Sequence, residues 1–280
     1  MTGTGTQTDP YIVSTWDDLV TSLSTTNSQS NMMIYIELNA DIDMNEVAPS
    51  GISAIETKSN FNLDGKGHII KNLVANDGFL RIGSAVGYSE TYISNLKILN
   101  FESRGSNNSE YFIFVSSGIK VYFQHCTLSG INVSTRVLLY VNKTSNSQAH
   151  FSATDEGGSM LDINVYTGGF LFGNIYLEDS YAKISGEEIC DEDAVWHMNN
   201  SYIEGRISGR FQNCYNSVVD AVSNNGDKNF GVSSCSNLLV NTDKFNGTFT
   251  TSVTGIKKVT AEQLIDAEYL ESIGFPLGVD

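Results

Sequence analysis

Positive charge is scarce in this chain. Its 280 residues include 16 lysines and arginines against 32 aspartates and glutamates, which gives a formal net charge of −16. Binding to nucleic acid depends on basic side chains that displace counterions from phosphates, and attraction to anionic lipid needs the same charge. The composition therefore predicts no nucleic-acid partner, and it favours a well-solvated surface.

Long apolar runs are also missing. No stretch approaches the roughly 20 apolar residues of a membrane-spanning helix, so no membrane insertion is expected. The first residues, Met1–Gly5, contain neither the basic region nor the apolar core of a secretion signal. We therefore expect synthesis in the cytoplasm without a signal peptide.

Proline occurs only toward the ends, at Pro10, Pro49 and Pro276. Proline cannot donate a backbone hydrogen bond to a strand ladder, so a proline-free stretch rich in Val, Ile, Phe and Tyr suits continuous sheet. The segment Met33–Leu38 alternates apolar and polar residues, as a strand does. No amphipathic helix follows the strand-like segments, which excludes doubly wound α/β folds and TIM barrels.

The cysteines are few, namely Cys126, Cys190, Cys214 and Cys235. Their spacing lacks the paired ligands of zinc sites, so neither a metal nor another cofactor is predicted. On neighbouring strands, Cys214 and Cys235 would lie about 4.8 Å apart, at which a disulfide is geometrically feasible. We favour buried free thiols, because free cysteine is among the most buried residue types.

A short motif recurs along the chain: an apolar residue, any residue, a small polar residue, and then Cys, Ser or Leu. It begins at Ile70, Ile93, Phe123, Leu177, Met198, Phe211 and Val232. Several gaps lie near one value, since 93 − 70 = 23, 198 − 177 = 21 and 232 − 211 = 21. Such repeats are typical of stacked solenoids. Other gaps, 123 − 93 = 30 and 211 − 198 = 13, leave the coil boundaries open.

Helical patterns occur only near the two ends. At the first, Trp16, Leu19, Val20 and Leu23 share one helical face, and Thr15 is placed as the N-cap. A solenoid needs covered ends that keep its core and strand edges from solvent. We therefore predict that this helix caps the stack.

At the second end, residues 260–263 form a capping box. Ile265, Tyr269 and Ile273 follow at intervals of four residues, and Gly274 then ends the pattern. The predicted organisation is an N-terminal strand and capping helix at 1–28, a strand stack at 29–256, and a C-terminal capping helix and tail at 257–280.

Some of these segments resemble a known family. Gly169-Phe170-Leu171-Phe172-Gly173, followed by Ile175 and Asp179-Ser180, is similar to the GLUG-type repeat of bacterial and phage surface proteins. The opening segment from Gly3 to Trp16 and the closing segment from Gln263 to Phe275 resemble those of β-helical phage proteins. The resemblance implies an all-β fold: a single right-handed parallel β-helix of the pectate-lyase-like type, with short capping helices near both termini.

Polysaccharide lyases and hydrolases occur on that fold, but no catalytic set is evident. Asp191-Glu192-Asp193 is the densest acidic cluster, and neighbours along a strand point to opposite faces, which favours a solvated turn. Asn241-Thr242-Asp243 and Gly67-His68-Ile69 match fragments of the galacturonan-hydrolase pattern in the wrong order. Glu204, Arg206 and Arg210 are interpreted as surface ion pairs.

The remaining candidates are histidines and tyrosines. The histidines are His68, His125, His150 and His197, and none has a visible triad partner in the sequence. Exposed aromatics that could stack on sugars are Tyr88, Tyr92, Tyr166 and Tyr202. Core packing explains most aromatics of such a fold, so no ligand-binding set is assigned. We predict no catalytic residue and no metal ligand.

The resemblance and the missing catalytic pattern favour a non-enzymatic structural or adhesive component of a bacteriophage virion, in the tail, the baseplate or a head-attached spike. Its expected partners are other virion proteins, further copies of the same chain in a homo-oligomer such as a trimer, and host-surface glycans. The expected location is the virion. The alternatives are a polysaccharide depolymerase and a bacterial surface adhesin module.

Overall fold

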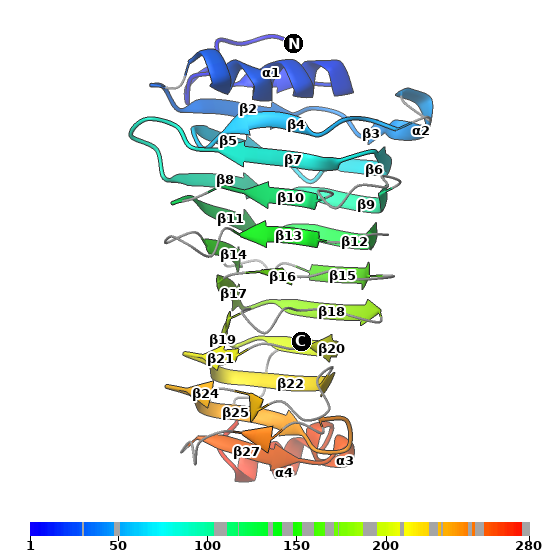
Figure 1. Ribbon diagram of the computed structural model, residues 1–280, viewed down its shortest axis with the longest axis vertical. Helices are drawn as coiled ribbons and strands as arrows, with labels where there is room; N and C mark the ends of the chain where they lie inside the picture. Colours follow the sequence, from blue (N-terminus) through cyan, green and yellow to red (C-terminus); the bar gives the residue numbers. More distant parts are fainter. Residues whose placement is uncertain are drawn as a thin grey trace.

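The computed structural model describes most of the chain. The described residues are 1–29, 31–47, 51–103, 111–116, 118–133, 137–141, 148–152, 160–165, 171–172, 174–186, 195–207, 210–223, 229–230, 232–245, 248–249 and 255–275. They form an elongated stack of short strands with few helices (Figure 1). Every pairing between named strands is parallel, so the predicted mostly-β class is confirmed at this level.

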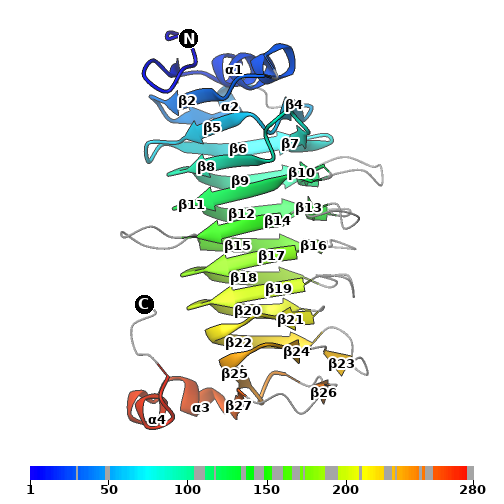
Figure 2. The ribbon, with the colours of Figure 1, turned by 90° about the vertical axis from the view of Figure 1, so that its left-hand side faces the viewer.

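The strands fall into three columns that run along the stack (Figure 2). The first column holds β1 (Tyr11–Val13), β2 (Ile34–Leu38), β5 (Phe61–Asp64), β8 (Glu90–Ser94), β11 (Lys120–Gln124), β14 (Gln148–Ser152), β17 (Asn174–Glu178), β19 (Val195–Asn199), β21 (Arg210–Gln212) and β24 (Val232–Ser233).

The second column holds β3 (Ile42–Asp43), β6 (Ile69–Ala75), β9 (Lys97–Ser103), β12 (Thr127–Val133), β15 (Met160–Val165), β18 (Tyr181–Gly186), β20 (Tyr202–Ile207), β22 (Tyr215–Ser223), β25 (Ser236–Asn241) and β27 (Ile256–Val259). The third holds β4 (Ile55–Lys58), β7 (Gly78–Gly83), β10 (Tyr111–Val115), β13 (Val137–Val141) and β16 (Leu171–Phe172). A separate pair joins β23 (Asn229–Phe230) to β26 (Thr248–Phe249).

From β2 to β16 the chain visits the three columns in turn, and each strand pairs with the strand of its own column one coil later. Alternate residues of each strand point inward, as in β2, where Ile34, Ile36 and Leu38 are buried. One main core therefore runs through the stack. Stacked rings mark its first part, with Phe79 between Trp16 and Phe112 at centroid distances of 6.3 and 5.7 Å.

The recurring motif has a clear structural basis. In all seven copies its small polar residue has a positive φ, from 45° at Asp179 to 59° at Asn72. Asparagine and aspartate tolerate this left-handed backbone better than most residues do. The motif therefore marks a corner at which each coil turns out of a strand.

The predicted coil spacing is confirmed in part. Leu177 pairs with Met198, and Phe211 with Val232, so both gaps of 21 are single coils. The gap of 23 is wrong as a coil, because Ile70 lies in the second column and Ile93 in the first.

The early coils are longer than the motif gaps indicated. Ile70 pairs with Ile98, and Ile93 pairs with Phe123, so these coils have 98 − 70 = 28 and 123 − 93 = 30 residues. The gap of 30, irregular in the sequence, is thus one coil. Two motif copies on different columns of the same coil cannot be told apart by spacing alone.

The N-terminal helix lies across the first coils at one end of the stack, as predicted (Figure 1). Helix α1 (Trp16–Ser28) begins at Thr15, whose side chain accepts a hydrogen bond from the amide of Asp18 at 3.2 Å. Leu19 and Leu23 are fully buried in the main core. A short helix, α2 (Met44–Val47), follows β3.

The C-terminal helix differs from the prediction. Two short helices, α3 (Ala261–Leu264) and α4 (Ala267–Ser272), replace one continuous helix. The capping box of Thr260 and Gln263 is present, but Asp266 starts a second helix by accepting a hydrogen bond from Tyr269. Ile265 lies between the two helices and is 88% exposed, so the four-residue periodicity did not mark one buried face.

These helices pack on the outside of the last coils. Phe275 forms a separate apolar cluster with Val218, Leu239 and Val259. Leu238, next to Leu239, belongs to the main core, so Leu239 faces the opposite side of its strand. The C-terminal segment therefore covers an outer face of β22, β25 and β27, where an end cap was predicted (Figure 2).

Candidate functional site

An outer row of aromatic rings follows the first column. Tyr92, Tyr122, His150, Tyr176 and His197 are successive register partners on β8, β11, β14, β17 and β19. Inward residues flank the described members of the row, such as Val121 and Phe123 beside Tyr122. Alternation along a strand therefore places the row on the outer surface.

The described rings of this row cover one another. Tyr92 and Tyr122 are stacked with centroids 4.8 Å apart, and Tyr176 and His197 with centroids 4.1 Å apart. A sugar that stacks on an aromatic ring needs an open ring face, and these stacked pairs use their facing sides on each other. The row therefore offers ring edges and hydroxyls more than open platforms.

Glu90 holds the first tyrosine pair in place. Its carboxylate accepts hydrogen bonds from the hydroxyls of Tyr92 at 3.1 Å and Tyr122 at 3.3 Å, and Lys120 lies 3.5 Å away. Burial, followed by the charge of Glu90, raises the pKa of Tyr122 to about 12. Both tyrosines therefore carry their protons at neutral pH, and Tyr122 is no candidate base.

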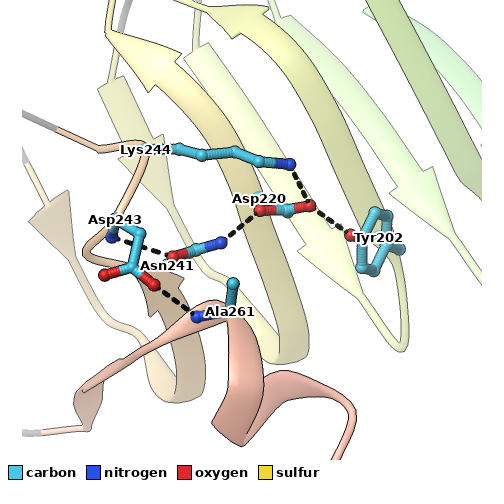
Figure 3. Close-up of polar contacts among 6 residues, drawn as sticks. All are labelled: Tyr202, Asp220, Asn241, Asp243, Lys244 and Ala261. Carbon is cyan, nitrogen blue, oxygen red and sulfur yellow. Dashed lines mark hydrogen bonds and ion pairs between the residues drawn. The ribbon is translucent and has the colours of Figure 1, made fainter.

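A second polar cluster lies near the C-terminus, around Asp220 on β22 (Figure 3). Its carboxylate accepts hydrogen bonds from the Tyr202 hydroxyl at 2.7 Å, the Asn241 amide at 2.6 Å and the Lys244 ammonium at 2.7 Å. Asp220 is 7% exposed. Buried charges of this kind are tolerated when they are paired and hydrogen-bonded.

The Asp220 cluster extends to the C-terminal helices. The Asn241 side-chain oxygen accepts from the amide of Asp243, and the carboxylate of Asp243 accepts from the amide of Ala261, the first residue of α3. Figure 3 shows this chain of contacts running from β20 to α3. The cluster therefore anchors the C-terminal segment to the stack.

The charge state of Asp220 argues against acid catalysis. Burial alone would raise the pKa of this carboxyl, but hydrogen bonds from Lys244, Tyr202 and Asn241 outweigh burial and lower it. Burial, with help from Asp220, raises the pKa of Tyr202. A general acid needs a carboxyl that is protonated near neutral pH, and Asp220 is the reverse of that.

Carboxylates on neighbouring coils would favour a glycosidase, and one outer pair has this arrangement. Glu37 and Asp64 are register partners on β2 and β5. The Lys66 ammonium lies between them, 3.2 Å from Glu37 and 3.3 Å from Asp64. The pair is therefore neutralised by a third side chain at its own position.

Several sequence candidates take structural roles. His68 pairs with Asp41 at 3.1 Å, and His125 occupies a left-handed corner with φ of 53°. Burial lowers the pKa of His197, which stacks on Tyr176. Each therefore has a local structural explanation.

The tyrosines proposed for sugar stacking have neighbours of their own. The Tyr88 hydroxyl donates to the carbonyl of Asn31 at 3.3 Å, and the ring of Tyr202 stacks on Tyr181 with centroids 5.7 Å apart. Tyr92 is engaged as described above.

The galacturonan-like letters Asn241-Thr242-Asp243 belong to the Asp220 cluster and carry no hydrolase geometry. Asp220 and Lys244 were missed in the sequence, because their contact spans 24 residues and depends on the coil register. Cys126, Cys214 and Cys235 are free and buried, as predicted.

Some predictions lie outside the described residues, namely those on Cys190, Asp191-Glu192-Asp193 and Tyr166. The side chains of Arg206, Arg210 and His150 are outside them as well. Within the described part, no group of three or more His, Cys, Asp or Glu side chains is placed to hold a metal ion. None of the helices in the described ranges is long and apolar enough to cross a membrane.

Comparisons with known proteins give little. No protein-family model matches the chain, and no curated protein matches it. One similar solved structure is described as a "putative immunoglobulin A1 protease" from Bacteroides ovatus. It has 16% sequence identity and a TM-score of 0.48 over 97% of this chain and 90% of that chain. A similarity of this degree supports no conclusion about activity.

Proposed function

We propose that the chain is a single right-handed parallel β-helix that serves as a non-enzymatic structural or adhesive component of a bacteriophage virion. The observation that supports this most is the cycling of the strands through three parallel columns around one continuous core. A long stack of this kind is a stiff rod, because each coil is held to its neighbours by ladders of backbone hydrogen bonds.

The state of the polar groups supports the non-enzymatic part of the proposal. Asp220 is saturated by donors, and Lys66 neutralises both Glu37 and Asp64. The phage assignment rests on the resemblance of the repeat and of the two terminal segments. The proposed partners are other virion proteins, further copies of the chain and glycans on the host surface.

The test is to purify particles from the source culture and to label them with gold-conjugated antibody against this chain. Labels at a fixed place on the particles, with the chain at constant stoichiometry by mass spectrometry, are the expected result. Particles made without the gene serve as the control. Particles that carry no label and no peptide of this chain would overturn the proposal and favour the secreted readings, including a bacterial adhesin.

A second candidate is a polysaccharide depolymerase, and the register pairing of Glu37 with Asp64 favours it. In this case the protein releases oligosaccharides from purified host capsule, and Glu37→Gln abolishes release while the fold is kept. The matched control is Glu56→Gln, which removes an exposed carboxylate on the third column. No release by the unaltered protein would exclude this candidate for the tested capsule.

A further inference from the structure

Cys214 and Cys235 occupy equivalent places on successive coils. The residues that follow them, Tyr215 and Ser236, are register partners on β22 and β25. The amide of Ser236 also donates to the carbonyl of Cys214 at 2.9 Å. The two cysteines are therefore neighbours across a parallel ladder, and both side chains lie in the main core.

This placement suits a covalent bond. Paired strands lie about 4.8 Å apart, inside the range of about 4.4 to 6.8 Å over which disulfides join two Cα atoms. The two thiols contact each other directly, since a hydrogen bond links their sulfur atoms. Both are free thiols in the structure.

The two sulfur atoms are not equivalent. Cys214 is fully buried, whereas Cys235 is 6% exposed and is the one that solvent reaches. The hydrogen bond between them lowers the pKa of Cys235 and, together with burial, raises that of Cys214. A thiolate is the attacking species in thiol–disulfide exchange, so Cys235 is the first to react.

We propose that Cys214 and Cys235 form a redox-sensitive pair that closes to a disulfide between two successive coils when the protein meets a small-molecule disulfide such as oxidised glutathione. The chemistry stands on the geometry alone. Only its timing rests on the proposed function, in which a chain assembled in a reducing cytoplasm is released into an oxidising medium.

The reaction proceeds in two exchange steps. The Cys235 thiolate attacks one sulfur of oxidised glutathione, which forms a mixed disulfide and releases one glutathione thiolate. Cys214 then loses its proton to that thiolate or to solvent and attacks the Cys235 sulfur, which releases the second glutathione. The protein loses two hydrogen atoms and two electrons, and one oxidised glutathione becomes two reduced ones.

Cys126 provides a matched control. It precedes β12 in the same motif position and is equally buried, with 1% exposure. Its neighbour on the preceding coil is Leu96, because Thr127 pairs with Lys97. Burial raises the pKa of Cys126 to about 12, which keeps its thiol protonated. We therefore expect Cys126 to stay reduced under the same conditions.

The experiment uses the full chain with Cys126→Ser and Cys190→Ser, so that only the proposed pair remains. This protein is incubated with oxidised glutathione under native conditions, and its intact mass and its disulfide-linked peptides are measured. The expected result is loss of the mass of two hydrogen atoms, with Cys214 and Cys235 in one linked peptide. Adding Cys214→Ser should leave a stable glutathione adduct on Cys235.

Two further measurements complete the test. The disulfide closes a loop of 235 − 214 = 21 residues, so thermal unfolding should shift upward by about 5 °C and return after reduction. A folded protein, verified by circular dichroism, whose two thiols both remain alkylatable would overturn the proposal. So would a linkage that forms only in urea. The thiol state of the chain taken from particles tests the timing separately.

Discussion

At the scale of single residues, the corners of the coils explain the motif. Asn200 donates its side-chain amide to Asp179 on the preceding coil and accepts from Asn216 on the following one, at 3.0 and 3.3 Å. Asn237 continues this amide ladder, and Lys257 donates to Asn237 at its far end. Each asparagine passes its donor toward the N-terminus, so a carboxylate that only accepts, Asp179, suits the first position.

Replacing Asn200 separates the two contributions of a corner residue. Asn200→Ala removes both ladder bonds and places a β-carbon residue at φ of 47°, so we expect a loss of about 2 kcal/mol in unfolding free energy. Asn200→Gly removes the same bonds but tolerates the backbone, and its loss should be smaller by about 1 kcal/mol. Urea unfolding measures both. Equal losses would show that the left-handed backbone is not a constraint.

Asp220 should make stability depend on acid. Its folded pKa is lowered below 3.8, so its contribution is present above the unfolded value and is lost as pH falls through the folded value. Asp220→Asn should therefore cost about 1–3 kcal/mol at pH 7 and flatten the acid dependence below pH of about 4. Tyr202→Phe removes one donor and should move the acid-induced loss to higher pH. Urea unfolding with an unchanged acid dependence in both variants would contradict this role.

At the scale of elements, the two helical ends do different work. Helix α1 covers the end of the main core, whereas the C-terminal segment covers an outer face. That segment is held by Phe275 in its apolar cluster, by Asp243 at the start of α3, and by Lys257, which donates to the carbonyl of Ile273. These contacts are few compared with the ladders of the stack, so the segment is the element that should detach first.

Truncating Phe275 should loosen the C-terminal segment selectively. Phe275 is 7% exposed, so Phe275→Ala should raise the rate of proteolysis within residues 260–275 several-fold under native conditions. Ile265→Ala is the matched control, because Ile265 is 88% exposed on the same segment and should change nothing. Cleavage sites are mapped by mass spectrometry. Equal rates in both variants would show that the apolar cluster does not hold the segment.

At the scale of the whole molecule, coil length is the variable quantity. The first coils have 28 to 30 residues, and later coils have 21, while the ladder register and the inward alternation are maintained. A stack tolerates this because each coil contacts only its neighbours. Surplus residues can leave the coil at its corners without disturbing the core.

Removing one whole coil should therefore shorten the stack without unfolding it. Deleting residues 177–197 takes out 21 residues and places Met198 where Leu177 stood, with the same side inward. We expect a folded protein with the sheet signal in circular dichroism and a cooperative thermal transition. Deleting residues 177–196 is the control, because it places His197 at the inward position and reverses every later side chain. Equal behaviour of the two deletions would contradict the register.

The sequence by itself determined the local features: the polar corner residues, the Thr15 cap, the capping box at Thr260, the buried thiols and the mostly-β class. Each depends on residues close together in the chain, where backbone preference and spacing act directly. Only the tertiary structure decided which motif copies share a column, that α3 and α4 pack on an outer face, and that Asp220 meets Lys244 and Tyr202. Those contacts depend on coil register, and insertions of variable length conceal register from any count along the chain.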